Sequence, residues 1–353
     1  MIHAGDSKVA IVGCGYVAQK SHIPAWRKIA KIVALVDSDE ALARRVGKQF
    51  GIDKTYSSLS DCLRHEKVDI TDISTPPDSH SNLAIEAMNA GSDVVIEKPM
   101  CLSVKEADAV LANAERNHRR ICVSHDWLYR PSVRTAIRFL QNDGVGKPNG
   151  FLMKYFEWKD DARLFDQDFW YRKLKGDIFY HILPHVVYLS LSFLGDLEVV
   201  SVVASKTSIK SWLPFDQLLI IMRNQKLQFA NIVMSCDSPG ELFEVDFFGE
   251  DRNLHVGQSC YTYSGARPGR SAFDTLFEDL SMSSSIFFSL FPRIVHRIGG
   301  PFYRPKDSHF YLFKDFVDSI NEPSRSKLPF LCSGEGGRKV VSLTNEIMSR
   351  LAI

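Results

Sequence analysis

The first third of the chain alternates short apolar runs with longer stretches whose apolar residues recur at helical spacing. The apolar runs predict strands at Lys8–Gly13, Lys31–Asp37, Val68–Thr75, Asp93–Glu97 and Arg120–Ser124. The stretches between them predict helices at Tyr16–Ala30, which Pro24 should break or kink, Asp39–Phe50, Asp78–Ala90 and Val104–Asn117. Because strands and helices alternate over short connections, the pattern predicts a parallel sheet covered on both faces.

After about Trp127 the pattern changes, and strands follow one another with few helices between them. It predicts helices at Pro131–Gln141, Asp177–Leu194, Ser308–Ile320 and Gly334–Leu351. Strands are predicted at Gly150–Trp158, Glu198–Lys206, Asp216–Met222, Gln228–Ser235 and Leu242–Gly249. Consecutive strands indicate a largely antiparallel sheet. The sequence therefore predicts an α/β nucleotide-binding domain at 1–126 and an α+β domain at 127–353.

Composition narrows the class of protein. The 353 residues include 43 basic and 42 acidic ones, a balance that argues against a dominant nucleic-acid or membrane field. The seven cysteines form no Cys-x-x-Cys pair, which indicates a reducing compartment and a cytoplasmic location. Residues 1–6 lack the pattern of a signal peptide, and no uncharged apolar run approaches the ~20 residues of a membrane span.

The segment 283–300 is strongly apolar at residues 286–291, and Arg293, His296 and Arg297 follow at once. One interpretation is a helix buried under the sheet or in the interface of a homo-oligomer. The other is a basic and aromatic surface that faces a membrane or a lipid-linked substrate.

A dinucleotide fingerprint directly follows the first predicted strand. The segment Gly13-Cys14-Gly15-Tyr16-Val17-Ala18 fits G-x-G-x-x-G/A, and Asp37 ends the next strand at about the expected distance. Gly13 permits a tight turn, Gly15 lets the backbone approach a pyrophosphate, and Ala18 allows close packing of helix on strand. The carboxylate of Asp37 suits ribose hydroxyls and repels a 2′-phosphate, so NAD is favoured over NADP, although Arg44 and Arg45 follow on the next helix.

The run Glu97-Lys98-Pro99 closes a predicted buried strand, Asp93–Glu97. Ligands bind at the carboxyl ends of parallel strands, and a partly desolvated lysine can carry out proton chemistry. Lys98 is therefore a candidate catalytic residue that faces a bound cofactor.

Four motifs in order resemble the glucose–fructose oxidoreductase, inositol dehydrogenase and rhizopine-catabolism (Gfo/Idh/MocA) family. They are Gly13–Ala18, Thr75-Pro76-Pro77-Asp78-Ser79-His80, Glu97-Lys98-Pro99 and Arg130-Pro131. The resemblance extends to Ser333-Gly334-Glu335-Gly336-Gly337. It implies a doubly wound Rossmann domain, an open and mostly antiparallel sheet in a second domain used for substrate binding and oligomerisation, and a nicotinamide cofactor.

The same resemblance assigns roles at the cofactor. Lys98 lies near the nicotinamide and the reacting carbon, Pro99 follows a cis peptide, and Glu97 orients Lys98 or a cofactor ribose. His80 either contacts the nicotinamide region or serves in helix capping and packing. The implied cofactor-binding residues are Gly13, Gly15, Tyr16, Val17, Ala18, Asp37, Ser74, Thr75, Pro76, His80, Glu97 and Lys98.

The second half of the site is implied at Gly176–His185, where many members carry Gly-Gly-x-x-x-Asp-x-x-x-His. His185 matches the histidine of that motif and is the candidate acid–base partner of Lys98, while His181 replaces the aspartate. His181 and His185 are four residues apart, so their side chains share one helix face. Pro184 should kink the helix, which can aim His181 and Tyr180 at the ligand, so Tyr180 is also a catalytic candidate. Asp177 and the two histidines also suggest a zinc site, because two histidines four residues apart can share one zinc ion. No metal is predicted, because no clear third ligand is evident and the chemistry of the family needs no metal.

Aromatic and basic residues suit a sugar ring and its hydroxyls. Arg172 and Lys173 give a slight preference for an anionic substrate, such as a nucleotide sugar or uronate. The candidate substrate-binding residues are Lys98, Asp126, Trp127, Tyr155, Trp158, Arg163, Trp170, Arg172, Asp177, His181 and His185.

The sequence thus predicts an NAD-dependent oxidoreductase that moves hydride to or from a hydroxyl or carbonyl carbon of a sugar, nucleotide sugar or cyclitol. The predicted assembly is a homo-oligomer, a dimer or tetramer, because family members often bury the open sheet against a partner. Two alternatives stay open. One is a lyase or glycosidase that uses NAD transiently, and the other is a non-catalytic NAD-binding protein.

Overall fold

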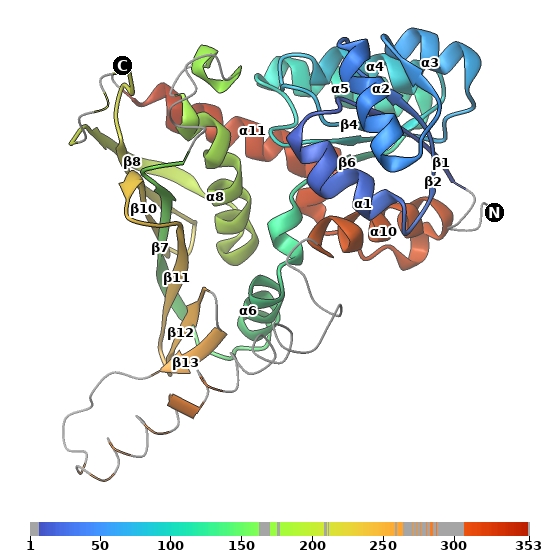
Figure 1. The fold of residues 1–353 in the computed structure, drawn as a ribbon. Helices are drawn as coiled ribbons and strands as arrows, with labels where there is room; N and C mark the ends of the chain where they lie inside the picture. Colours follow the sequence, from blue (N-terminus) through green and yellow to red (C-terminus); the bar gives the residue numbers. More distant parts are fainter. Residues whose placement is uncertain are drawn as a thin grey trace. The chain divides into compact units, whose positions relative to one another are not determined.

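The computed structural model divides into two compact units, which are described separately (Figure 1). The first comprises Met1–Tyr129 with Pro305–Ser342, and the second Arg130–Arg304 with Leu343–Ile353. The structure describes residues 7–161, 170–174, 177–207, 210, 212–257, 260–263 and 307–351, together with 271, 273, 276, 280, 283, 284 and 287. Arg163 and most of the segment 283–300, on which two predictions rest, lie outside these residues.

A six-stranded parallel sheet forms the centre of the first unit, with strands in the order β3-β2-β1-β4-β5-β6. Its strands are β1 (Lys8–Val12), β2 (Lys31–Val36), β3 (Thr55–Tyr56), β4 (Ile70–Ile73), β5 (Asp93–Ile96) and β6 (Ile121–Val123). All five pairings are parallel. Strands β4 and β5 are buried along their whole length, as expected for a sheet covered on both faces. The predicted doubly wound parallel sheet is confirmed.

Side-chain caps start three helices of this unit. Asp39 caps α2, Ser58 caps α3, and Ser103 with Glu106 forms a capping box at α5. The helices are the π-helical turn η1 (Ala18–His22), α1 (Ile23–Trp26), α2 (Glu40–Phe50), α3 (Leu59–His65), α4 (His80–Asn89), α5 (Val104–Asn117), η2 (Asp126–Tyr129), α10 (Asp307–Asn321), η4 (Pro323–Arg325), η5 (Phe330–Cys332) and α11 (Gly334–Ser349).

The helix predicted at Tyr16–Ala30 differs from the structure. Its π-helical turn ends at His22, and α1 ends at Trp26, with Pro24 in the first turn of α1, where a missing N–H costs no helical hydrogen bond. The sequence analysis also missed β3 and α3, because a two-residue strand and a seven-residue helix are too short for a periodic signal.

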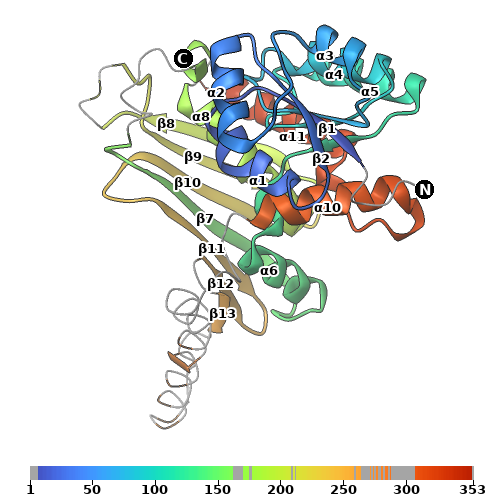
Figure 2. The same ribbon diagram turned by 45° about the vertical axis from the view of Figure 1, so that its right-hand side comes forward.

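The second unit is built on a seven-stranded sheet in the order β13-β12-β11-β7-β10-β9-β8, which Figure 2 shows. Its elements are α6 (Pro131–Gln141), β7 (Pro148–Trp158), η3 (Trp170–Lys173), α8 (Ile178–Leu194), β8 (Glu198–Ser205), β9 (Gln217–Arg223), β10 (Phe229–Ser238), β11 (Leu242–Gly249), β12 (Asn253–Val256) and β13 (Cys260–Tyr263). Every pairing is antiparallel except that of β7 with β10. The predicted, mostly antiparallel open sheet is confirmed.

One face of this sheet carries exposed apolar side chains. Val203 on β8 pairs with Leu219 on β9, and Leu219 pairs with Val233 on β10, so the three side chains share a face. Val203 is 55% and Leu219 40% exposed, whereas the next residue on β9, Ile220, is fully buried. The alternation places the core on the opposite face of the strands.

The division of the chain differs from the predicted domains at the C-terminal end. Residues 305–342 pack with the first unit, although the prediction assigned all of 127–353 to the second domain. The ring of Phe313 on α10 stacks on Trp26 of α1 at 4.6 Å, and both side chains are fully buried. Sequence order alone gives no sign that a distant helix returns to the first unit.

Among the residues that the structure describes, no helix combines the length and the apolar character needed to cross a membrane.

Candidate functional site

The fingerprint turn follows β1 and packs against Ser74, the residue that follows β4. Gly13 has φ +93°, and a Cβ there would lie 2.8 Å from the carbonyl group of Ser74. The Ser74 N–H donates to Val12 O at 2.8 Å, and its hydroxyl donates to Gly13 O at 3.0 Å. Both the backbone angle and the close approach therefore require glycine at position 13.

The next positions of the fingerprint leave a free approach to the backbone. A Cβ at Gly15 would have no neighbouring atom within 4 Å, and Tyr16 and Val17 are exposed. Ala18 is fully buried, as expected for the position that packs the helix on the strand. The turn thus fits the pyrophosphate of a dinucleotide, which the backbone N–H groups at a helix start bind well.

Alanine at the two fingerprint glycines should have opposite effects. Gly13→Ala should destabilise the protein by about 1–3 kcal/mol, because the methyl group meets Ser74 and the backbone angle is strained. Gly15→Ala should leave the melting temperature nearly unchanged but weaken NADH binding, since its methyl group enters the open side of the turn. Thermal denaturation and a fluorescence titration with NADH measure the two effects. Unchanged NADH affinity in Gly15→Ala would place the cofactor elsewhere.

Asp37 ties the fingerprint to the start of α2. Its Oδ2 accepts a hydrogen bond from the Cys14 N–H at 2.7 Å, and its Oδ1 accepts one from the Asp39 N–H at 2.9 Å. Arg44, which could have compensated a 2′-phosphate, pairs with Glu40 at 2.9 Å. The predicted contact of Asp37 with ribose hydroxyls stays a prediction.

Lys98 follows the buried strand β5 and is itself half-buried. The Lys98–Pro99 peptide is cis, as the resemblance implied. The Lys98 N–H donates to Glu97 Oε2 at 3.1 Å, so Glu97 holds the backbone of the motif. The buried ring of His80 bridges Pro99 O at 2.9 Å and Thr75 O at 2.8 Å. The packing interpretation of His80 thus has direct support, while its contact with nicotinamide stays a prediction.

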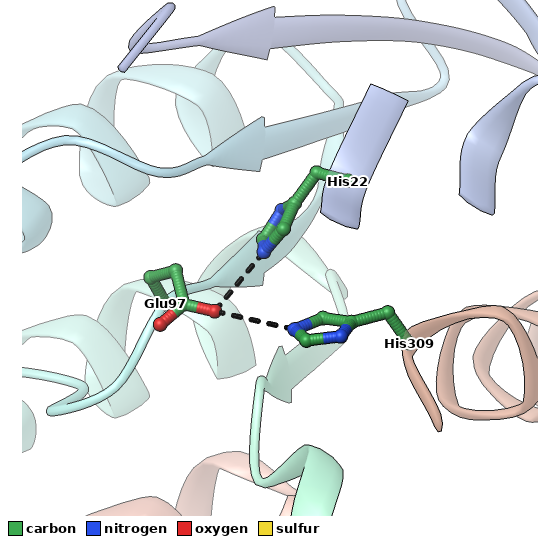
Figure 3. A group of neighbouring side chains, drawn as sticks. All are labelled: His22, Glu97 and His309. Atoms are coloured by element: carbon green, nitrogen blue, oxygen red, sulfur yellow. Dashed lines mark hydrogen bonds and ion pairs between the residues drawn. The ribbon is translucent and has the colours of Figure 1, made fainter. Parts of the chain in front are cut away.

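Glu97 belongs to a network of buried polar side chains, and Figure 3 shows the three at its centre. His22 Nδ1 lies 2.8 Å from Asp72 Oδ2, which also accepts from Trp26 Nε1 at 2.7 Å. His22 Nε2 lies 3.0 Å from Glu97 Oε1, and His309 Nε2 lies 3.8 Å from the same oxygen. The Glu97 carboxylate, next to Lys98 in sequence, therefore lies beside a histidine of η1 and a histidine of α10.

The charges in this group support one another. Burial by itself lowers the pKa of His22, but the charge of Asp72 and the hydrogen bonds to Asp72 and Glu97 outweigh it and raise that pKa to about 10. Burial raises the pKa of Glu97, but the hydrogen bond with His22, the nearby His309 ring and the charges of His22 and Lys98 outweigh it, so the pKa lies well below its usual value. At neutral pH, His22 is therefore cationic and Glu97 anionic.

In the second unit, four predicted or neighbouring residues gather at the start of α8. Arg172 Nη1 lies 2.5 Å from Asp177 Oδ1 in a nearly buried ion pair, and Asp177 caps the helix. The rings of Tyr171 and His181 stack at 5.7 Å. Because Asp177 balances the charge of Arg172, this arginine no longer favours an anionic substrate.

His185 lies one turn further along the same helix. Its Nδ1 lies 2.6 Å from the Tyr188 hydroxyl, and both side chains are buried. The Tyr180 hydroxyl donates to Asn345 Oδ1 at 3.0 Å, which connects α8 to α11. In the described part of the chain, the groups with metal-binding geometry do not include Asp177, His181 or His185. Lys98 and His185 belong to different units, so their pairing stays a prediction.

The other predicted substrate residues have varied surroundings. Tyr155 is buried and donates to Glu157 Oε1 at 3.0 Å, whereas Trp158 is 43% exposed. Asp126 accepts a hydrogen bond from the Ser308 hydroxyl at 2.9 Å in the first unit, and the neighbouring Trp127 is half-buried. For Trp170, the backbone of η3 is described, but its side chain lies outside the described part.

Sequence analysis missed His22, Asp72, Trp26 and His309. Each is an isolated polar or aromatic residue with no motif around it, and His309 lies more than two hundred residues from Glu97 in sequence. The one available signal was Asp72, a carboxylate between Ile70 and Ile73 of the predicted strand, which would need a partner if it were buried.

Known proteins resemble both parts of this chain. The family described as "Oxidoreductase family, NAD-binding Rossmann fold" (GFO_IDH_MocA) matches residues 7–125. D-apiose dehydrogenase from Paraburkholderia graminis is 34% identical over 143 residues, 40% of this chain and 38% of that protein. UDP-N-acetylglucosamine 3-dehydrogenase from Acidithiobacillus ferrooxidans is 27% identical over 208 residues, 58% of this chain and 60% of that protein. The matched stretches thus span less than two thirds of these relatives.

Solved structures share the fold over nearly the whole chain. An oxidoreductase from Thermotoga maritima matches with a TM-score of 0.78 at 18% identity and covers 97% of this chain and 96% of its own. The WlbA dehydrogenase from Bordetella pertussis, solved with NADH and UDP-GlcNAcA, matches with a TM-score of 0.77 at 16% identity and covers 99% and 96%. At these identities the structures establish the fold alone. The family match agrees with the resemblance drawn from the motifs over residues 7–125, the part of this chain that is similar to the NAD-binding Rossmann domain of the Gfo/Idh/MocA oxidoreductases.

Proposed function

We propose that this protein is an NAD-dependent dehydrogenase or reductase that acts on a hydroxyl or carbonyl carbon of a sugar or nucleotide sugar. One observation carries the proposal. The open fingerprint turn after β1 and the half-buried Lys98 after β5 lie at the carboxyl edge of one parallel sheet, with only β4 between the two strands. This arrangement supports a role for Lys98 as an acid–base residue beside a bound dinucleotide.

The residues have distinct roles in this proposal. NAD, when bound, supplies the acceptor or donor of the hydride. Lys98 donates a hydrogen bond to the reacting oxygen, stabilises the negative charge that develops there and relays its proton. His185, from the second unit, is the partner that receives or returns the proton. The names of the relatives, which include dehydrogenases of D-apiose, levoglucosan and UDP-N-acetylglucosamine, support the sugar class.

The cofactor preference is proposed to be NAD, on the strength of Asp37. Asp37→Ala removes the carboxylate that opposes a 2′-phosphate, so the ratio of NADPH to NADH affinity should rise at least about tenfold, equal to 1.4 kcal/mol. Competitive fluorescence titration measures this ratio. Asp53→Ala, a change at an exposed acidic site of the same domain, is the control and should leave the ratio unchanged. Wild-type protein that binds NADPH more tightly than NADH would contradict the role of Asp37.

The reaction itself is tested with a panel of aldoses, cyclitols and nucleotide sugars, followed at the nicotinamide absorbance and by mass spectrometry of the products. NADH formation coupled one-to-one to an oxidised sugar is the expected result. Product without net NADH would instead identify a lyase or glycosidase with transient use of the cofactor. Tight NADH binding without any product across the panel would indicate a non-catalytic protein.

Two further proposals concern the oligomeric state and the location of the protein. The exposed apolar face at Val203 and Leu219 supports a homo-oligomer that buries the open sheet, which light scattering can test. All seven cysteines are free and six are buried, which supports a reducing, cytoplasmic location.

A further inference from the structure

Three side chains of the first unit place ligand-type atoms around one point (Figure 3). They are His22 at the end of the π-helical turn, Glu97 after β5, and His309 in the first turn of α10. One nitrogen or oxygen from each lies within 4.8 Å of the others, and all three residues are buried. π-helical turns are rare and occur often at functional sites, so the position of His22 is itself notable.

Hydrogen bonding accounts for only part of this arrangement. His22 Nε2 and Glu97 Oε1 are 3.0 Å apart, a normal hydrogen bond. His309 Nε2 is 3.8 Å from the same oxygen, and His309 Nδ1 is 3.7 Å from Asp126 Oδ2. Both distances exceed a good hydrogen bond, so His309 points at two carboxylates without closing fully on either.

Each histidine also has a carboxylate at its other ring nitrogen. Asp72 lies 2.8 Å from His22 Nδ1, and Asp126 lies 3.7 Å from His309 Nδ1. Histidines that bind metals almost always donate their second N–H to a carboxylate, a carbonyl or water, which fixes the tautomer and orients the ring. Here both Nε2 atoms are left facing the shared Glu97 oxygen.

The spacing and the charge suit a small divalent ion. Ligand atoms at zinc bond lengths lie about 3.3 Å apart around a tetrahedral ion, and the two separations to Glu97 Oε1 fall on either side of that value. Asp72, Glu97 and Asp126 carry three negative charges. A divalent ion bound by two neutral imidazoles would offset part of this negative charge.

We propose that His22, Glu97 and His309 form a binding site for a divalent transition-metal ion, with zinc the best match to two imidazoles and one carboxylate. The Glu97 and His309 side chains each keep 11% of their surface exposed, so an ion can enter and water can complete its coordination. The bound ion ties α10 to the end of β5 and to η1. The proposal concerns this structural link and does not depend on the dehydrogenase activity.

The first experiment uses the full chain after treatment with a chelator. Zinc chloride is added, the protein is desalted, and the metal is counted by elemental analysis. About one zinc per chain is expected, together with a higher melting temperature. Cobalt(II) in place of zinc should give the visible absorption bands of a four-coordinate site. Failure to retain either ion would overturn the proposal.

Variants then locate the ion. His309→Gln should weaken zinc binding at least ~100-fold and abolish the zinc-dependent rise in melting temperature, and Asp126→Asn should weaken binding about 10–100-fold. His65→Gln, at an exposed position on α3, is the matched control and should bind like the wild type. Circular dichroism in chelator shows whether each variant folds. If His309→Gln does not fold, the zinc affinity of Asp126→Asn tests the site instead. Wild-type binding in either folded variant, or loss of binding in His181→Gln instead, would refute the site.

Discussion

Replacing Lys98 with alanine should lower turnover on the true substrate at least ~100-fold, the low end for a positioned acid–base group. The structure supplies the reason, since Lys98 is half-buried at the end of a fully buried strand and its backbone is held by Glu97. Because the side chain extends from a fixed loop, its loss removes the proton relay and leaves the loop in place. The measurement is steady-state turnover, with NADH affinity determined separately.

Two variants separate the roles of Lys98. Lys98→Arg keeps the positive charge but cannot release a proton, so it should recover substrate binding better than turnover. Lys105→Ala, an exposed lysine in the first turn of α5, is the control and should turn over normally. Turnover of Lys98→Ala close to that of Lys105→Ala would remove Lys98 from the mechanism.

Replacing Asp72 with alanine should lower the free energy of unfolding by about 3–5 kcal/mol, the usual cost of removing one partner of a buried ion pair. Asp72 is fully buried and accepts from both His22 Nδ1 and Trp26 Nε1. Without it, a cationic imidazole and an indole N–H lose their partner where water cannot replace it. Denaturant unfolding in the presence of a chelator measures the change without any contribution from metal.

A matched pair of variants tests the cause of that loss. Asp72→Asn keeps an oxygen acceptor and should lose less stability than Asp72→Ala. Asp108→Ala removes an exposed carboxylate that pairs with Arg338, and its effect should be much smaller. Similar midpoints for Asp72→Ala and Asp108→Ala would mean that the buried network contributes little to stability.

The elements that sequence predicted well have strong local signals. The helix predicted at Val104–Asn117 has both ends as predicted, and Ser103 and Glu106 form a capping box at its start; β11 was predicted at Leu242–Gly249 as observed. The first helix starts at Tyr16 as predicted, but it ends at Trp26 and not at Ala30, and Pro24 lies within this helical stretch. The second, α+β part was predicted from its run of strands, but the single parallel pairing of β7 with β10 has no local signal.

The residues of the candidate site also differ in how well the sequence predicts them. The fingerprint glycines and Glu97-Lys98-Pro99 are contiguous motifs, so their chemistry can be inferred from neighbouring residues alone. The network behind Glu97 cannot, because His22 and His309 come from opposite ends of the chain and neither residue type is unusual where it stands. Arg172, a basic residue expected to attract a substrate, is paired with Asp177, and its role in substrate binding stays a prediction.

By itself, the sequence determined the alternation of strands and helices, the dinucleotide turn and the position of the candidate lysine at a strand end, since each depends on neighbouring residues and on backbone preferences. Only the tertiary structure decided that residues 305–342 return to the first unit and that two histidines converge on Glu97. The physical reason is that a buried charge is tolerated only beside a partner, and the partner is chosen by packing in space. Sequence separation carries no information about that choice.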